Sequence, residues 1–259
     1  MNLVGILEQP RIPDSAPLAR VVGDWLASRA VASWTAAPVD DENLDAPLDG
    51  TSLLVVLGGD GSTLRAARWT VPYGVPIFGI NVGRVGFLSE STPENWTEKL
   101  ERVLNGDYWI ERRLLLHAEL WRDGQLVAPF TALNEVVIGR GAQARVIHLH
   151  LRVDDDLVTT YIADALIVAT PTGSTAYAMA AGGPLMPPQL QNLVVVPVAA
   201  HLSLNRSLVL HENARLSISV EKRSHVQLCP RRKFGLFLSP PDGPPGFQLA
   251  ASESWPEQG

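Results

Sequence analysis

Along the first hundred residues, short apolar runs alternate with segments that carry apolar residues at helical spacing. Leu3–Leu7 and Pro76–Ile80 are predicted strands, and the five aliphatic residues of Leu53–Leu57 are typical of a parallel strand covered on both faces. Residues 16–30 and 92–104 predict helices, and a further helix is expected to start after residue 63. This alternation predicts an open α/β domain over residues 1–105, with a Pro- and Asp-rich loop at residues 38–50.

From about residue 106 the pattern changes to short apolar runs separated by turn residues. The predicted strands are Leu114–Trp121, Gln125–Phe130, Glu135–Ile138, Val146–Val153, Leu157–Ile162 and Leu166–Ala169. The clearest turns lie at residues 122–124 and 154–156. We therefore expect a β-rich, sandwich-like second domain over residues 106–234. A loop is expected at residues 239–246, and the tail, about residues 235–259, is a candidate to pack back on the first domain.

Composition and charge restrict the class of protein. The chain has 259 residues, 46% of them hydrophobic and 19% charged, which is typical of a globular protein. Its net charge of −6 argues against binding to nucleic acid or to anionic lipid through a basic face. The single cysteine, Cys229, excludes an intramolecular disulfide and a cysteine-ligated zinc cluster. With no signal-like N-terminus and no apolar run of membrane length, we expect a soluble, cytoplasmic protein.

The first segment with chemical potential is Gly58-Gly59-Asp60-Gly61-Ser62, between a predicted strand and a predicted helix. Its glycines would let the backbone approach a ligand closely and adopt positive φ. The start of the helix offers free N–H groups to a phosphate, and Arg65 could reach back toward it. A tight turn with Asp60 as helix cap explains the same residues about equally well.

Two further segments are weaker on their own. Gly79–Leu88 contains three glycines after a strand, but it matches neither the dinucleotide fingerprint nor the Walker sequence. Asn134-Glu135, at the mouth of a strand, could hydrogen-bond a ribose or a base edge, or could be an ordinary strand-entry turn.

The most informative segment is Thr170-Pro171-Thr172-Gly173-Ser174-Thr175-Ala176-Tyr177, which follows the predicted strand at 166–169. Its hydroxyls and the amides of a small-residue helix beginning near Thr175 could hold a ligand, and Tyr177 offers a ring for stacking on a base. A capped helix with a packed tyrosine is the structural alternative. Ser174 lacks the Gly-x-Ser-x-Gly context of a hydrolase nucleophile, and His148 and His150 have no third metal ligand near them in sequence.

Taken together, these segments resemble the NAD kinase family. The resemblance is carried by Gly58–Gly61, Gly79–Leu88, Asn134-Glu135, Asp164, Thr170–Tyr177, Gly182-Gly183-Pro184 and Val195–Leu210. The Gly-Gly-Asp-Gly piece is shared with lipid kinases and phosphofructokinases, whereas the Thr-Pro-Thr-Gly-Ser-Thr-Ala-Tyr piece is much more specific. The resemblance implies an α/β domain and a β-rich domain with the site in the cleft between them.

The resemblance also implies an activity and a set of site residues. The activity is phosphoryl transfer from ATP or polyphosphate to the 2′-hydroxyl of the adenosine ribose of NAD, with Mg²⁺ held mainly by the substrate phosphates. Asp60 matches the proton acceptor, and Gly61 and Arg65 match positions beside the phosphates and the reacting ribose. Positions that contact the dinucleotide are matched by Asn134, Glu135, Asp164, Thr175, Ala176, Tyr177, Ala180 and Ala199. Members of the family assemble as homodimers or homotetramers.

The chain departs from the family pattern at a few positions. Ala165 replaces a glycine, Ala200 stands where a proline often precedes the residue matched by His201, and no Asp-Gly-Gln piece occurs near residues 221–224. These departures favour, as an alternative, a catalytically weak NAD(P)-binding protein of the same fold. A diacylglycerol-type lipid kinase is a further alternative, against which the polar segment at residues 170–177 argues.

Overall fold

The computed structural model describes residues 1–38, 44–83, 86–140, 146–201 and 204–220, together with the backbone of strands at 226–230, 236–238 and 246–252. The chain divides into two compact units, and the boundary lies between Glu111 and Arg112. Each unit is described by itself. No helix within the described ranges is long and apolar enough to span a membrane.

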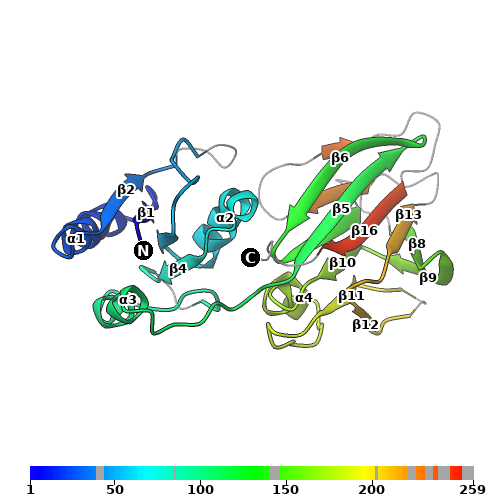
Figure 1. Ribbon diagram of the computed structural model, residues 1–259. Coiled ribbons are helices and arrows are strands. Elements are labelled where there is room, and N and C mark those ends of the chain that lie inside the picture. The colour runs from blue at the N-terminus through cyan, green and yellow to red at the C-terminus, as the bar shows by residue number, and fades with distance from the viewer. Residues whose placement is uncertain are drawn as a thin grey trace. The chain divides into compact units, whose positions relative to one another are not determined.

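The first unit contains both helices and strands (Figure 1). Its strands are β1 (Leu3–Leu7), β2 (Ala32–Ala36), β3 (Leu53–Leu57) and β4 (Ile77–Ile80). Its helices are α1 (Ser15–Ala27), α2 (Asp60–Thr70), the 3₁₀ turn η1 (Val71–Tyr73) and α3 (Trp96–Leu104). The strands form a parallel sheet in the order β2-β1-β3-β4, which confirms the predicted α/β domain.

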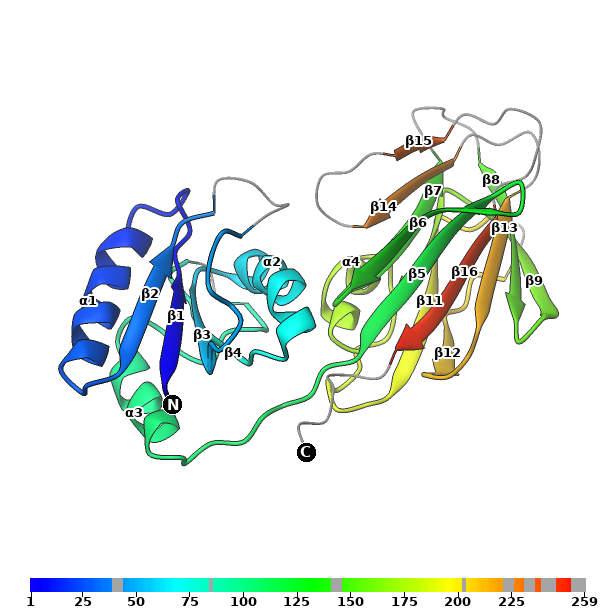
Figure 2. The ribbon, with the colours of Figure 1, turned by 45° about the horizontal axis from the view of Figure 1, so that its top comes forward.

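Helices cover both faces of this sheet. One hydrophobic cluster joins α1 and α3 to one face, through residues such as Leu26, Leu100 and Val55. A second joins α2 to the other face, through Ala66 and Trp69 against Leu54 and other strand residues. Figure 2 shows the resulting layers, with α1 and α3 on one side and α2 on the other. All of β3 is buried, because its side chains face a helix on either side.

The predictions for this unit differ from the structure at the element ends. The helix predicted at 16–30 ends at Ala27, and the one predicted at 92–104 begins at Trp96. Asn95 accepts a hydrogen bond from the Thr92 N–H at 2.9 Å, so the residues before α3 form a turn. The strand β2 was not predicted, because an edge strand of mixed, largely exposed residues has no apolar run to mark it. Of the predicted loop at 38–50, residues 44–50 lie in no helix or strand, and 39–43 lie outside the described residues.

The second unit is built mainly of strands (Figure 1). They are β5 (Leu115–Arg122), β6 (Gln125–Ala132), β7 (Glu135–Arg140), β8 (Ile147–Val153), β9 (Asp156–Ala163), β10 (Ala165–Ala169), β11 (Asn192–Val198), β12 (Leu208–His211), β13 (Leu216–Val220), β14 (Val226–Pro230), β15 (Leu236–Leu238) and β16 (Gly246–Ser252). The 3₁₀ turn η2 (Gly173–Thr175) and the short helix α4 (Tyr177–Ala180) follow β10.

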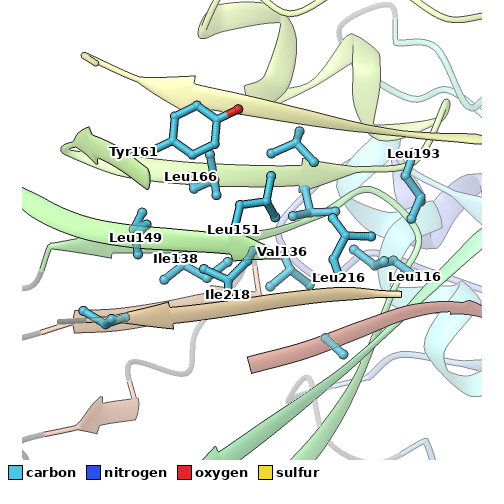
Figure 3. Packing of buried hydrophobic residues seen from close by; sticks show 14 of the residues in the cluster. Leu116, Val136, Ile138, Leu149, Leu151, Tyr161, Leu166, Leu193, Leu216 and Ile218 are labelled. Carbon is cyan, nitrogen blue, oxygen red and sulfur yellow. The ribbon is translucent and has the colours of Figure 1, made fainter. Parts of the chain in front are cut away.

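The strands form two sheets that pack face to face. Their orders are β12-β11-β10-β7-β14-β15 and β6-β5-β16-β13-β8-β9. Alternate residues of both sheets fill the core between them, and Figure 3 shows Tyr161, Leu151 and Ile218 among these side chains. Each fully buried aliphatic side chain of this kind contributes about 1.5–3 kcal/mol. The sandwich-like domain predicted from the sequence is therefore confirmed.

The hairpin turns follow the predicted chemistry. Asp123 and Gly124 connect β5 to β6 with φ of 51° and 75°, and Asp154 and Asp155 connect β8 to β9 with φ of 49° and 72°. Positive φ at both central residues is the geometry that matches the twist of a two-stranded ribbon, and aspartate tolerates it better than most residues.

The strands after residue 190 were not predicted. In the described part of the tail, the strands pair within the second unit, and residues 253–259 lie outside the described residues. The strand β16 pairs with β5 and β13, and β15 pairs with β14, so both belong to the second unit. Residues 239–245 of the predicted loop lie outside the described residues, and Gly246 begins β16.

Candidate functional site

Asp60 is the first residue of α2, directly after the carboxyl end of β3. Gly58 and Gly59 connect the strand to the helix, and Gly59 is the N-cap residue with extended backbone. An acidic side chain in the first turn of a helix is favourable because the helix dipole is positive there. The side chain of Asp60 is half-buried.

The second glycine segment meets this carboxylate. The backbone N–H of Phe87 donates to Asp60 Oδ2 and that of Leu88 to Oδ1, both at 3.0 Å. The Gly58 N–H donates to the Ile80 carbonyl at 3.0 Å, so the two segments are joined at their strand ends as well. Within the first unit, the structure thus brings together the two segments that the sequence singled out there.

The glycines of the first segment do not adopt the positive φ that was one of the two predicted reasons for them. Among the described glycines, positive φ occurs at Gly50, Gly74, Gly106, Gly124 and Gly182, and not in the segment 58–61. A Cβ at Gly58 would lie 2.2 Å from Ser62 Oγ, whereas a Cβ at Gly59 would meet no atom of the described residues within 4 Å. Close packing against Ser62, rather than a left-handed backbone, requires the glycine at position 58.

Arg65 lies one turn further along α2. Its side chain is half-buried, and its guanidinium carbon lies 5.9 Å from the centre of the Trp69 ring, within the range of a cation–π contact. Gly61 is half-buried next to Asp60. Both therefore lie on the first two turns of the helix that carries the carboxylate.

In the second unit the candidate residues gather around the ends of β7 and β10. These strands are antiparallel neighbours, and Glu135 is opposite Ala169. The Thr170 N–H donates to the Asn134 carbonyl at 2.9 Å, and the Gly173 N–H donates to Thr170 Oγ1 at 3.1 Å. The loop after β10 is thereby fastened to the residues that precede β7.

The hydroxyls of this loop mainly hold the loop itself together. Ser174, which is fully buried, donates to the Pro171 carbonyl at 2.6 Å and accepts from the Met186 N–H at 2.9 Å. Thr175 donates to the Thr172 carbonyl at 3.0 Å, and Arg113 donates to Thr172 Oγ1 at 3.3 Å. The hydroxyls of Ser174 and Thr175 therefore already have partners within the fold, as in the structural alternative of a capped helix start.

The helix expected to begin near Thr175 is the single turn α4. Its first residue, Tyr177, is half-buried and packs against the cluster formed by β7, β10, β11 and Met186. Ala176 is half-buried and Ala180 is exposed. The small-residue helix expected from the sequence is therefore only one turn long.

Asn134 and Glu135 differ in what they can offer. Glu135 is 2% exposed, and strand alternation places its side chain on the same face as Val137, the face covered by α4. The side-chain oxygen of Asn134 is buried and has no hydrogen-bond partner among the described residues. A buried acceptor without a partner is costly, which makes Asn134 a candidate to bind a donor group of a ligand.

Asp164 lies between β9 and β10 and is held by Arg140. The Arg140 Nε lies 3.1 Å from Asp164 Oδ1, and the Arg140 backbone N–H donates to the Asp164 carbonyl at 2.9 Å. The Asp164 N–H donates to the Val198 carbonyl at 3.0 Å, and the next residue, Ala199, has a left-handed φ of 49°. Asp164 and Ala199 are therefore brought close although 35 positions separate them in the numbering.

Ala165, which departs from the family pattern, is accommodated by packing. It is 7% exposed and belongs to the cluster that α4 covers. Its partner across the sheet is Gly139, whose missing Cβ would lie 3.5 Å from the Ala165 Cβ. The extra methyl group therefore fills space opposite a glycine. Ala200, the second departure, is half-buried, and residues 221–225, where the third departure falls, lie outside the described residues.

Sequence reasoning missed several residues that build the site. Arg140, Arg113 and Met186 fix Asp164, Thr172 and Ser174, but none of them stands next to its partner in sequence. An open hollow of about 590 Å³ also lies beside the predicted residues, and it is lined by Gly182, Gly183, Pro184, Asn205, Arg206 and Ser207. Its lining residues fall in two of the segments that carry the family resemblance, Gly182-Gly183-Pro184 and Val195–Leu210.

A metal ion would find few protein ligands. In the described part of the chain, no group of three or more His, Cys, Asp and Glu side chains could hold one. The carboxylate of Asp60 is a hard oxygen donor, but both its oxygens already accept backbone hydrogen bonds. These residues suit a cation that arrives with most of its ligands already supplied by phosphates.

Comparison with known proteins bears on both units. Residues 42–108 match the family profile of the ATP-NAD kinase N-terminal domain, and residues 133–231 match that of the ATP-NAD kinase C-terminal domain. NAD kinase of Chloroflexus aurantiacus is 43% identical over 231 residues, which cover 88% of this chain and 83% of that protein. NAD kinase of Heliobacterium modesticaldum is 37% identical over 262 residues, which cover 98% of this chain and 89% of that protein.

Solved structures show the same fold. Yeast NADH kinase complexed with NADH matches 97% of this chain and 81% of its own, with a TM-score of 0.78 and 20% identity. An NAD kinase from Archaeoglobus fulgidus in complex with ATP matches 98% of this chain, over 91% of its own length, with a TM-score of 0.73 and 26% identity. The sequence relatives, the domain profiles and the two-unit fold together show that this chain belongs to the NAD kinase family, a family of phosphotransferases that act on an alcohol group.

Proposed function

We propose that this chain transfers the terminal phosphoryl group of ATP to the 2′-hydroxyl of the adenosine ribose of NAD, which yields NADP and ADP, and that Asp60 is the base. In this reaction the ribose oxygen forms a bond to the γ-phosphorus. The bond from that phosphorus to the β–γ bridging oxygen breaks, and the hydroxyl proton passes to the Asp60 carboxylate. Inorganic polyphosphate is a second candidate donor.

The surroundings of Asp60 support this role. A ribose hydroxyl is a poor nucleophile, and a carboxylate within hydrogen-bond reach can orient it and accept its proton. Each carboxylate oxygen accepts one backbone N–H bond, from Phe87 or Leu88, and has capacity for a second. The half-buried side chain is therefore held in place and can still accept a hydrogen bond from a substrate.

Residues of the second unit are proposed to hold the dinucleotide. The partnerless side-chain oxygen of Asn134 supports its proposed hydrogen bond to a donor group of NAD. The half-buried ring of Tyr177 could stack on a base, and Asp164, fixed by Arg140, could accept from a hydroxyl or amide. The full proposed set is Asn134, Glu135, Asp164, Thr175, Ala176, Tyr177, Ala180 and Ala199.

Neither the Asp60 base nor the proposed dinucleotide-binding residues neutralise the negative charge on the phosphoryl group that is transferred. We propose that Gly61 and Arg65 lie beside the phosphates, where an arginine offers fixed N–H donors and a positive charge. Mg²⁺, bound mainly by the phosphates of the donor, would supply the remaining charge neutralisation. Beside the Asp60 base and the Arg65 charge, the chain contributes positioning, which is a large part of catalysis in reactions of this type.

The observation that carries the proposal is an aspartate fixed through both of its oxygens at the end of a buried strand, in a chain of the NAD kinase family. The test is NADP formation from NAD with ATP or polyphosphate and Mg²⁺. Asp60→Asn should lower turnover by several orders of magnitude, since a base and a charge are lost together. Asp49→Asn, at an exposed carboxylate, is the matched control and should keep wild-type turnover.

Two results would contradict the proposal. If Asp60→Asn kept near-normal turnover, the assignment of the base would be wrong. If calorimetry detected NAD binding while no donor gave NADP, the chain would be a binding protein of the same fold. We also propose a cytoplasmic homodimer or homotetramer, which sedimentation equilibrium of the purified chain would test.

A further inference from the structure

Gly86 lies against the carboxylate of Asp60, although 26 positions separate them in sequence. A Cβ built on Gly86 would lie 2.1 Å from Asp60 Oδ1, 2.5 Å from Cγ and 2.7 Å from Oδ2. Side-chain carbons do not approach other heavy atoms so closely, so any residue other than glycine would displace the carboxylate or the loop.

The close approach has a consequence for the two residues that follow. Because the backbone at Gly86 passes directly over the carboxylate, the next two N–H groups can each reach one of its oxygens. Two hydrogen bonds to two different oxygens fix the plane of the carboxylate as well as its position. The terminal torsion of an aspartate is otherwise broad, so this is an ordering that the side chain would not have by itself.

We propose that Gly86, with the backbone N–H groups of Phe87 and Leu88, is a positioning residue for Asp60. The proposal rests on the proposed function, in which Asp60 accepts the ribose proton. Gly86 acts through the carboxylate and touches no substrate. Its role is to leave room for the loop to hold the base at a fixed orientation.

Gly83 provides a matched control in the same loop. Among the described residues, the atom that a Cβ at Gly83 would approach is Asn81 Oδ1, at 3.9 Å, which is ordinary contact. Both Gly83 and Gly86 have a φ outside the left-handed region, so alanine is compatible with the backbone at either position. The two substitutions differ mainly in whether they disturb Asp60.

The first experiment is kinetic. Gly86→Ala should lower kcat for NADP formation about 100-fold, because a misplacement of about 1 Å can cost that much, and should change KM for NAD less than about threefold. Gly83→Ala should retain wild-type kcat. Wild-type kcat in Gly86→Ala, or an equal loss in both variants, would overturn the proposal.

The second experiment needs no activity. Gly86→Ala should lower the thermal midpoint of the wild-type chain much more than that of Asp60→Ala, in which the three atoms nearest to the new Cβ are gone. Should Gly86→Ala fail to fold, recovery of folding in the double variant would support the proposal. An equal loss in both backgrounds would overturn it. If the wild-type chain made no NADP, the proposed function would fail while this stability coupling could still be measured.

Discussion

Gly173 lies directly against Asn134, and a Cβ added to Gly173 would be 2.1 Å from the Asn134 carbonyl oxygen. That same oxygen accepts the Thr170 N–H at 2.9 Å. The loop after β10 therefore closes over the residue before β7, and the contact has no space for a side chain. Asn134 is placed by backbone contacts rather than by its own side chain.

Gly173→Ala should displace this loop and lower both activity and stability. Forcing a methyl group into a filled site costs about 1–3 kcal/mol. For a chain of this size, that corresponds to a fall of about 2–12 °C in the thermal midpoint. Gly23→Ala in α1, where the nearest atom would be Ile6 Cδ1 at 3.8 Å, is the control and should be neutral or stabilising. Equal midpoints for the two variants would contradict the argument.

Ser174→Ala should destabilise the second unit although Ser174 is not assigned a role in catalysis. The substitution leaves the Met186 N–H without the acceptor that it has at 2.9 Å, in a fully buried place. An unsatisfied buried donor costs about 1–3 kcal/mol. Ser28→Ala, at an exposed serine, should change the free energy of unfolding by less than about 0.5 kcal/mol. Denaturant titrations of both variants would measure the difference, and a wild-type midpoint for Ser174→Ala would refute it.

Arg140→Gln should affect binding more than stability. The ion pair with Asp164 is about one-third exposed on both sides, so solvent screens it, and its loss should cost at most about 1 kcal/mol. If Asp164 contacts the dinucleotide, as proposed, a freer carboxylate should raise KM for NAD several-fold with kcat little changed. Steady-state kinetics at low and high salt would test this. A fall in kcat at constant KM would instead assign Arg140 to the chemical step.

Tyr161→Phe should reduce the fall in the free energy of unfolding as the pH rises above about 10. Burial raises the pKa of Tyr161 from 10.0 to about 12. Between these values the unfolded chain loses the phenol proton while the folded chain keeps it, so stability falls as pH rises through this window. Over this pH window the free energy of unfolding should fall by about 2–3 kcal/mol.

The same variant has an expected effect at neutral pH. The Tyr161 hydroxyl is buried with no hydrogen-bond partner among the described residues, so its removal should be neutral or stabilise by about 1 kcal/mol. Urea titrations at pH 7 and at pH 10–11 would measure both effects. Tyr73→Phe, at an exposed tyrosine, should keep the wild-type pH dependence. An unchanged alkaline slope in Tyr161→Phe would contradict the prediction.

The amino-acid sequence alone determined the class of each half and the segments that carry the chemistry. Strands β3, with five aliphatic residues, and β8 and β9, with alternating residues, were predictable. The pattern of apolar residues along such a strand indicates which of its faces are buried. Edge strand β2 was not, because its mixed, largely exposed residues are stabilised by pairing with β1, and that pairing leaves little trace in local composition. Strand β11 does carry an apolar run, but that run was not assigned to a strand.

Only the tertiary structure decided how the segments act on one another. Nothing in the order of residues says that Phe87 and Leu88 hold Asp60, that Gly173 closes on Asn134, or that Arg140 fixes Asp164. The sequence left two roles open for the hydroxyls of residues 170–177, binding a ligand or capping a helix, and in the fold Ser174 and Thr175 donate to backbone carbonyls of their own loop. A residue's type fixes which bonds it can form, but its partner depends on which backbone groups the fold brings within about 3 Å.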